Sequence, residues 1–169
     1  MIILGVDTAI RCTGYGVLEA KSLNVMTVLD CGIIKNSVKL KHSECLRRLA
    51  GGIREITNRF HPDAVAIEDV FYCKNVKTAM ILSLARGAVI TVLAEAEIAT
   101  YAYSPKTVKR AIVGTGSAAK EQVALMVANL LGMRLEDVPF DATDALAAAL
   151  AHAQIALRPE LSMLLPREV

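Results

Sequence analysis

The chain has 169 residues, a formal net charge of +2 and 54% hydrophobic residues, with no tryptophan. A chain of this length forms one compact domain and buries about two-thirds of its unfolded surface, so its core needs neither disulfides nor metal ions. No uncharged apolar run reaches the ~18 residues of a membrane span, and the first residues carry no export signal, so we expect a cytoplasmic protein. The four cysteines lack the CxxC spacing of a zinc site and the density of a secreted disulfide scaffold.

The first part of the chain predicts three strands, a helix and a fourth strand. The three strands are expected at 1–7, 14–20 and 24–35. Residues 12–14 have the composition of a turn between the first two strands. Apolar residues recur at helical spacing from about 42 to 60, and His61-Pro62 ends that helix. AVAIEDV, at 64–70, is apolar enough for a buried strand.

The second part of the chain predicts one strand among four helices. A long helix is expected at 75–98, and we expect its buried face to carry Met80, Leu84, Ala88 and Val92. A strand at 99–104 follows. Three further helices are expected at 104–114, 120–132 and 140–154, the first with proline at its start and the first two with glycine at their ends.

The element order βββαβαβααα indicates the α/β class. Sequential strands with short connections form an antiparallel meander, whereas strands joined through helices lie parallel, so we expect a mixed sheet with helices on both faces. We assign 1–156 to a single domain. Residues 157–169 contain two prolines and mixed charge, and are expected to form a short, loosely attached tail.

Four carboxylates occupy unusual positions in this arrangement. Asp7 ends the first strand, Glu68 lies in an apolar strand, and Asp141 and Asp144 are helical neighbours three residues apart. If all four meet at one end of the sheet, their like charges repel unless a cation lies among them. Hard oxygen ligands favour Mg²⁺ or Mn²⁺, and two such ions about 4 Å apart can activate water and stabilise the leaving oxygen in phosphodiester cleavage.

Each acid also has a structural interpretation. Asp141 is suited to cap a helix that begins after Pro139, with Asp144 interacting favourably with the helix dipole. Asp7 is suited to start an Asx turn. Glu68 would point into solvent if its strand were at the edge of the sheet. Taken one at a time, these structural interpretations are preferred to a metal site.

The basic residues are concentrated in one stretch of the chain. Between 70 and 120 there are seven lysines and arginines and only two glutamates, a local charge of seven minus two, or +5: Lys74, Lys77, Arg86, Lys106, Lys109, Arg110 and Lys120 against Glu95 and Glu97. Such a stretch can bind a polyanion by releasing condensed counterions, or it can be an ordinary solvated basic face.

Five sequence blocks, in order and spacing, resemble the RuvC-type Holliday junction resolvases of bacteria. They are LGVDTAIRCTGYGV, AIEDVFYCKN, the ARG at 85–87, YSPKTVKRAIVGTGSAAKEQV and DATDALAAALAH. A D-x-x-D pair or an early G-x-D alone would be weak evidence, but five blocks in register over about residues 1–155 are specific.

The resemblance implies a ribonuclease H-like fold and a homodimer that nicks two opposed strands of a four-way DNA junction symmetrically, with Mg²⁺ as cofactor. Two ions per active site are expected, and Mn²⁺ can substitute. By position, the family's metal-binding acids correspond to Asp7, Glu68, Asp141 and Asp144, although some members carry histidine at the place of Asp141. The resemblance also implies partnership with the branch-migration proteins RuvA and RuvB.

The same resemblance assigns DNA contacts. Phe71 stands where the family inserts an aromatic residue into the junction centre, and Tyr72, Lys74 and Asn75 follow it. Without the resemblance, Phe71 and Tyr72 would be interpreted as covering the edge of the sheet. Lys109 and Lys120 match family lysines near the DNA backbone and the active site, whereas on pattern alone they are ordinary surface lysines.

Two further expectations concern helices. The helix at 75–98, with small residues at Ala79, Ser83 and Ala85, is our candidate for part of a two-fold interface. His152 lies more than two helical turns beyond Asp144, and we expect it to be structural.

Three classes of function are therefore considered. A metal-dependent junction nuclease uses all four acids, whereas a catalytically silent junction-binding module would not need them. An actin-like or sugar-kinase half-domain also begins with a G-x-D strand, but it needs a second similar domain that this length does not contain. The four acids favour the nuclease.

Overall fold

The computed structural model describes residues 1–69 and 75–169 and contains one mixed five-stranded sheet. The strands are β1 (Ile2–Asp7), β2 (Cys12–Ser22), β3 (Val25–Lys35), β4 (Ala64–Glu68) and β5 (Thr100–Tyr103). Their order is β3-β2-β1-β4-β5. The first three strands are antiparallel and β4 and β5 run parallel to β1, which confirms the predicted meander and crossovers.

Each of the five strands has one of its ends at the same side of the sheet, and the acids expected in the site lie at this side. β1, β4 and β5 finish there, at Asp7, Glu68 and Tyr103, because parallel strands end on the same side. β2 begins at this end and β3 finishes there, since Cys12 is paired with Lys35. We call this side the carboxyl end of the sheet.

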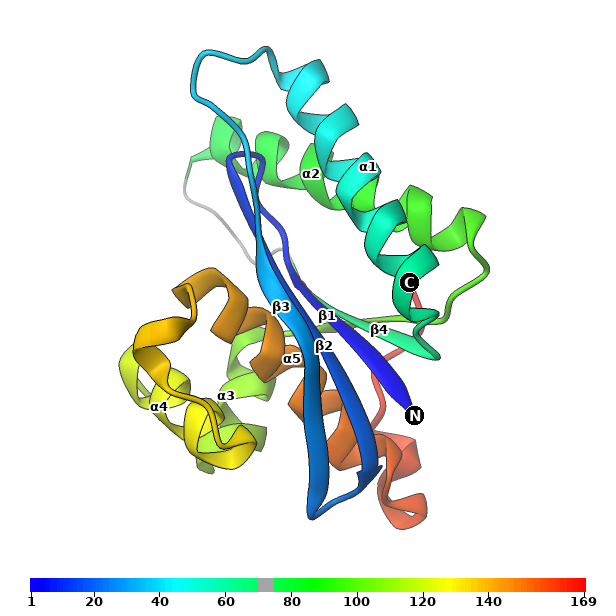
Figure 1. Cartoon of the computed structure of the whole chain (residues 1–169), viewed down its shortest axis with the longest axis vertical. Helices are drawn as coiled ribbons and strands as arrows, with labels where there is room; N and C mark the ends of the chain where they lie inside the picture. Colours follow the sequence, from blue (N-terminus) through cyan, green and yellow to red (C-terminus); the bar gives the residue numbers. More distant parts are fainter. Residues whose placement is uncertain (70–74) are drawn as a thin grey trace.

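Helices cover both faces of the sheet (Figure 1). They are α1 (His42–Phe60), α2 (Val76–Glu95), α3 (Pro105–Val113), α4 (Lys120–Leu131) and α5 (Phe140–Ala156), with short 3-10 helices η1 (Leu135–Asp137) and η2 (Pro159–Leu164). The helices α1 and α2 pack on one face, in a core with residues such as Leu4 and Ile67. The other three pack on the opposite face, around Ile3 and Ala66.

Glycines in β1 and β2 allow α5 to lie directly on the sheet. A Cβ atom at Gly5 would stand 1.9 Å from the carbonyl oxygen of Ala145, and one at Gly14 would stand 1.9 Å from that of Asp141. Gly14 therefore belongs to strand β2 and not to the turn predicted at 12–14. The composition around this glycine predicted a chain reversal, but its role is to admit a helix at close range.

The buried face of α2 differs from the prediction. Its buried side chains are Ala85, Val89, Val92 and Leu93, of which only Val92 was predicted. Met80 is 64% exposed and Leu84 is 52% exposed, although both were expected in the core. The helix is almost uniformly apolar, so helical spacing alone does not distinguish the face that meets the sheet from the face that does not.

The composition of α2 also bears on the expectation of no membrane span. Among the described residues, α2 is one helix that is long and apolar enough to cross a membrane by length and composition. Such a test is also passed by core helices of soluble proteins. The buried side of α2 packs against α1 and the sheet in the second core.

The tail is attached to the sheet, contrary to the expectation of a loose segment. Residues 159–164 form η2, which packs against α5. Beyond it, Glu168 forms an antiparallel bridge with Tyr101, and the Val169 N–H donates to the Thr100 carbonyl at 2.9 Å. The exposed edge of β5 provides backbone partners that the composition of the tail does not reveal.

Candidate active site

Two strands and one helix bring four acids to the carboxyl end of the sheet. Asp7 and Glu68 are the last residues of adjacent parallel strands, while Asp141 and Asp144 lie in the first turns of α5. The helix passes over β1 and β2 at the glycines described above, which holds its start beside Asp7. The charge of Asp7 is coupled to those of Glu68, Asp144 and Asp141.

The observed packing removes two of the structural interpretations. The N-cap position of α5 is Pro139, and Asp141 lies inside the helix in its first turn, so Asp141 does not cap it. Strand β4 lies between β1 and β5, so Glu68 is not on an edge strand. Glu68 is half-buried and faces the same pocket as Asp144.

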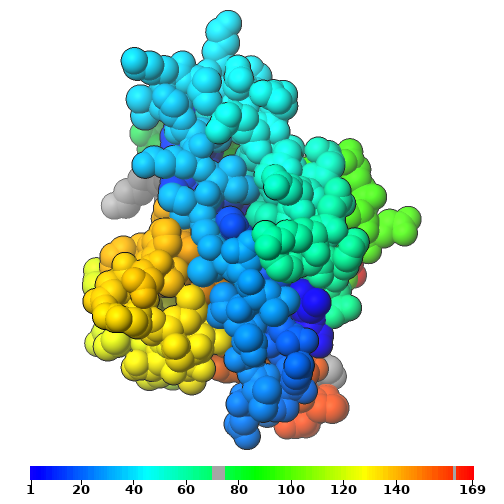
Figure 2. Space-filling view, viewed as in Figure 1, coloured from blue at the N-terminus to red at the C-terminus, as the bar shows by residue number. Residues whose placement is uncertain are grey.

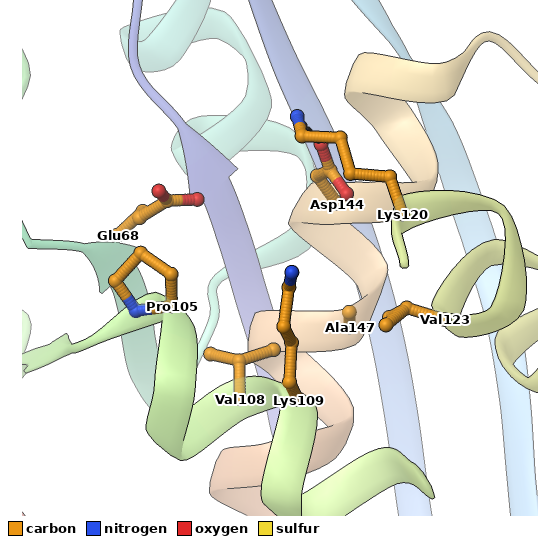
Figure 3. A pocket seen from close by; sticks show the side chains of 8 residues that line it. All are labelled: Glu68, Pro105, Val108, Lys109, Lys120, Val123, Asp144 and Ala147. Atoms are coloured by element: carbon orange, nitrogen blue, oxygen red, sulfur yellow. Dashed lines mark hydrogen bonds and ion pairs between the residues drawn. The ribbon is translucent and has the colours of Figure 1, made fainter. Parts of the chain in front are cut away.

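That pocket has a volume of about 230 Å³ and is walled by α3, α4 and α5 (Figure 3). It combines an acidic pair, two lysines and a small apolar wall: Glu68, Asp144, Lys109, Lys120, Pro105, Val108, Val123 and Ala147. The sequence analysis identified its charged members but not the apolar ones. The position of Pro105 could have been predicted, because the last strand is followed directly by a helix that begins with proline.

Burial and like charge make this site unfavourable for free carboxylates. Burial, together with the negative charges of Glu68 and Asp144, raises the pKa of Asp7 to about 7. Burial also raises the pKa of Glu68, and again the charge of Asp144 adds to the effect. A cation at this position would reverse both effects, because the charged form would then be stabilised.

Two lysines supply positive charge in the structure. The Lys120 ammonium lies 2.9 Å from a carboxylate oxygen of Asp144, and this bond raises the pKa of Lys120. Lys109 extends from α3 into the pocket, where its ammonium donates to the Ala118 carbonyl at 2.6 Å. Figure 3 shows both ammonium groups on the side of the pocket where Glu68 and Asp144 point.

The acids have the chemistry of a hard-metal site, although their side chains are not yet gathered as ligands. Among the described residues, no three histidine, cysteine or acidic side chains are grouped closely enough to hold an ion. Asp144 is instead paired with Lys120. The donor set of Asp7, Glu68, Asp141 and Asp144 consists only of carboxylate oxygens, and the raised pKa of Asp7 marks a place that favours a cation, so the residues fit Mg²⁺.

Cys12 is a neighbour of the site to which the sequence pattern assigned no role. Burial and, after it, a hydrogen bond with Asp141 raise the pKa of its thiol to about 11. The thiol therefore stays protonated and can donate to the Asp141 carboxylate. No pattern in the sequence connects these two residues, since 129 positions separate them.

The predicted DNA-contact residues are only partly described. Phe71, Tyr72 and Lys74 lie outside the described residues, so their assignment stays a prediction. Asn75 is the N-cap of α2, and its side-chain oxygen accepts from the Thr78 N–H at 3.2 Å. One residue next to the site was not predicted: Arg86 of α2 forms an ion pair with Asp69, directly after Glu68.

The buried histidine is structural, as expected. His152 is 2% exposed, and its Nδ1 lies 2.9 Å from the Tyr103 hydroxyl. Burial lowers the pKa of His152 to about 4. The pair connects the far part of α5 to the end of β5, inside the core.

The fold and the site first define a class. A three-stranded meander continued by parallel strands, with acids at the ends of β1 and β4 and on a helix across the same end, is the arrangement of ribonuclease H-like nucleases. A fold comparison agrees: the yeast mitochondrial Holliday junction resolvase Ydc2 superimposes with a TM-score of 0.63 over 95% of this chain and 83% of that one, at 12% identity.

Sequence comparison then gives the family. A family model described as crossover junction endodeoxyribonuclease RuvC matches residues 3–152. The chain belongs to this family of junction-resolving endonucleases. A relative from Pelodictyon phaeoclathratiforme, a crossover junction endodeoxyribonuclease RuvC, is 40% identical over 150 residues, which are 89% of this chain and 78% of the relative.

A solved structure of the same family is closely similar. T. thermophilus RuvC, determined in complex with a Holliday junction substrate, is 35% identical and gives a TM-score of 0.90 over 100% of this chain and 99% of that one. The resemblance seen in the sequence blocks is thus confirmed for the family and for the fold.

Proposed function

We propose that this protein resolves four-way DNA junctions in recombination and repair by nicking two opposed strands symmetrically. The observation that carries the proposal is the convergence of Asp7, Glu68, Asp141 and Asp144 at one end of the sheet, beside a pocket with two lysines. Carboxylates hold a cation and lysines hold phosphates, so the site has the parts that phosphodiester hydrolysis needs.

The four acids are the proposed metal ligands. The family is one of metal-dependent nucleases, and we propose Mg²⁺ as the ion, with two ions per site and Mn²⁺ able to substitute. When bound, such ions activate water and stabilise the leaving oxygen. Lys120 now neutralises Asp144, and if a cation were held by Asp144, the Lys120 ammonium would be available to a phosphate of the substrate.

The lysines have a binding role in this proposal. Lys109 is held by the Ala118 carbonyl, so its ammonium is fixed over the pocket before DNA arrives. Lys120 is 71% exposed along its side chain, although its ammonium contacts Asp144, so it can reach a phosphate by a small rotation. Together they position the backbone of the strand that is cut.

Junction recognition is assigned to the segment after Glu68. We propose that Phe71 stacks on a base opened at the crossover, with Tyr72, Lys74 and Asn75 contacting the nearby strand. Stacking of an aromatic side chain on a base contributes about 1–3 kcal/mol and tolerates any sequence. This fits an enzyme that recognises the shape of a junction.

A homodimer is proposed because one such site cuts one strand. The exposed face of α2 supports it, since Val76, Met80 and Leu84 are 71%, 64% and 52% exposed and follow one another at helical spacing. Ala85, which we expected in this interface, is buried in the core instead. We also propose a cytoplasmic location and partnership with RuvA and RuvB, both on the basis of family membership.

The proposal is tested by removing one acid. Asp7→Asn should abolish nicking of a synthetic four-way junction in Mg²⁺, measured on a denaturing gel, while leaving junction binding intact, measured by fluorescence anisotropy in Ca²⁺. The matched control is Asp137→Asn, an exposed acid of η1 outside the pocket. Cleavage by Asp7→Asn at a rate near that of the wild type would overturn the metal site.

A linear duplex and ATP, each offered to the wild type in the same buffer, distinguish the other classes of function. A junction-specific nuclease consumes neither at a comparable rate. Consumption of ATP would favour a phosphoryl-transfer domain, and binding without cleavage of any DNA would favour a silent junction-binding module.

A further inference from the structure

The loop between β3 and α1 lies at the same end of the sheet as the acids. It comprises residues 36–41 and follows Lys35, whose partner in the sheet register is Cys12. The positive charge of Lys35 acts on the Cys12 thiol, which itself bonds to Asp141. The loop therefore begins within electrostatic reach of the acidic site, on the side opposite to α3 and α4.

A buried asparagine fixes the start of this loop. Asn36 is 4% exposed, and its amide nitrogen donates to the carbonyls of Ile10 at 2.9 Å and Cys45 at 3.2 Å. Its amide oxygen accepts from the Arg48 guanidinium at 3.0 Å. All polar atoms of the Asn36 side chain thus bond to neighbouring segments and hold the start of the loop in place. Because the loop is already ordered, it loses little conformational entropy when a ligand binds.

An arginine from the β1–β2 connection fixes the middle of the same loop. One guanidinium nitrogen of Arg11 donates to the carbonyl of Ser37 at 2.6 Å and to that of Leu40 at 3.2 Å. The Arg11 carbonyl in turn accepts from the Asn36 N–H at 2.9 Å. Since Arg11 is four residues after Asp7, the loop is connected directly to the chain that carries the first acid.

Lys35 at the end of β3, and Lys39 and Lys41 of the loop, have no acidic partner among the described residues. Lys35, Lys39 and Lys41 are exposed, and none forms an ion pair with a residue that the structure describes. Val38, between them, is 80% exposed at the tip. Figure 2 shows this segment, in light blue to cyan, forming the upper end of the molecule. Three unneutralised ammonium groups on a fixed, projecting loop favour a polyanion.

We propose that Lys35, Lys39 and Lys41 form a second phosphate-contacting surface, which holds the duplex arm of the junction leading away from the cut. The inference rests on the proposed function and adds the path of the DNA. The acids would then lie between two groups of lysines, with Lys109 and Lys120 on the other side. A strand crossing from one group to the other passes directly over the acids.

The geometry of the sheet gives the expected spacing. Strands lie about 4.8 Å apart and rise about 3.3 Å per residue, so the loop, two strands away from β1 and several residues beyond its end, stands roughly 10–20 Å from Asp7. One base pair occupies about 3.4 Å along a duplex. The contacted phosphates therefore lie about three to six base pairs from the cleaved bond.

The test compares two triple variants that lose the same charge. In the first, Lys35, Lys39 and Lys41 are replaced by alanine. In the control, Lys21, Arg54 and Arg158 are replaced; the first and last lie at the far end of the sheet, and Arg54 pairs with Glu95 at the end of α2. Junction affinity of the wild type and both variants is measured by anisotropy in Ca²⁺ between 50 and 200 mM salt.

Each phosphate contact contributes about 0.9 to the slope of log affinity against log salt. In the first variant the magnitude of this slope should therefore be about two to three smaller than in the wild type. Its affinity at the lower salt should be about tenfold weaker, for every junction sequence alike. The control should follow the wild type. Equal slopes for the wild type and the first variant, or an equal loss in the control, would overturn the proposal.

A second measurement locates the contact. Neutral methylphosphonates placed three to six base pairs from the cut should weaken wild-type binding and leave the first variant unaffected. Sensitivity of both proteins to the same neutral linkages would overturn the assignment. Failure of the wild type itself to bind junctions would instead remove the proposed function, and this inference with it.

Discussion

Two helices of similar composition have opposite surroundings in this molecule. Both α2 and α5 are apolar on all sides and contain little charge. Every residue of α5 from Ala142 to Ala153 is buried except Asp144, which is half-buried, whereas α2 buries only four side chains and exposes others of large size. Composition places a helix in contact with something apolar, but it does not say whether this is its own sheet or another molecule.

The difference originates in the sheet under each helix. Glycines in β1 and β2 let α5 descend until its backbone touches the strands. The face under α2 is built of larger residues such as Val6 and Ile67, and α1 shares it. The helix that touches the strands, α5, is buried on most sides. The helix α2, which packs over larger side chains, keeps one exposed side.

The largest expected effect tests the close packing of α5. Gly5→Ala places a methyl group 1.9 Å from the Ala145 carbonyl oxygen, so the helix must move, and we expect a loss of about 3 kcal/mol or more in the free energy of unfolding, measured in urea. Gly51→Ala on α1 is the control, because nothing lies within 4 Å of its new methyl group. Equal stability of the two variants would contradict the close contact.

The next largest expected effect is the dependence of stability on pH that comes from the buried His152 of α5. His152 has a pKa of about 4 when folded, against about 6.5 unfolded, so the unfolded chain binds more protons between these values. The neutral histidine contributes stability above pH 6.5, and this is lost as pH falls through 4, by up to about 3 kcal/mol.

His152→Gln should flatten the dependence of unfolding free energy on pH over this range. The control is His42→Gln, an exposed histidine at the start of α1, which should leave it unchanged. The slope is read from urea unfolding at half-unit steps of pH. A slope in His152→Gln equal to that of the wild type would mean that another group binds the proton.

The exposed side of α2 is tested by adding charge. Met80→Lys with Leu84→Lys should weaken a dimer about 100-fold, which corresponds to about 2.7 kcal/mol, because each subunit would have to bury two charges in the interface. The stability of the monomer should change by less than about 0.5 kcal/mol, since both side chains are exposed. Sedimentation velocity over a concentration series gives the dissociation constant.

Leu125→Lys provides the matched control for this pair, since Leu125 of α4 is 54% exposed and apolar but lies on the other face of the sheet. A monomeric wild type at micromolar concentration, or a loss as large in the control, would refute the interface on α2.

The smallest expected effect is that of a methyl group added at Gly87, on the open side of α2. Gly87→Ala adds a methyl group with nothing within 4 Å, so the helix should gain about 0.5–1 kcal/mol in the monomer from its better propensity. If the dimer packs over this glycine, the same change weakens association. Thermal unfolding at low and high protein concentration separates the two results, and a loss of stability at low concentration would disagree with the open space found there.

Much of the fold could be predicted because hydrophobic spacing and stop signals are local. The order of strands and helices follows from such patterns, as in α3, which begins at Pro105 and ends before Gly114 as predicted. Gly14 could not be interpreted correctly, because its need for space comes from Asp141, far along the chain. The face of α2 could not be predicted either, since a uniformly apolar helix has no preferred side.

The strand ends and the helical spacing suggested a meeting of the four acids, and the family resemblance made this interpretation the preferred one. Singly, Asp141 fits a helix cap, and only the packing of α5 places it beside Asp7. The pairs Lys120–Asp144 and Cys12–Asp141 join residues from different elements, so no spacing rule connects them. Tyr103 and His152 are similar: each has a polar group that needs a partner when buried, but the sequence does not say which.

The attachment of the tail also affects how the folded protein behaves in concentrated solution. An edge strand offers free N–H and C=O groups to any other extended chain, and this is a common route to aggregation. At β5 part of that edge is occupied by Glu168 and Val169, so a foreign strand would have to displace them. The glutamate also adds a charge that discourages apolar strands from pairing there. The last residues thus contribute to colloidal stability as well as to the fold.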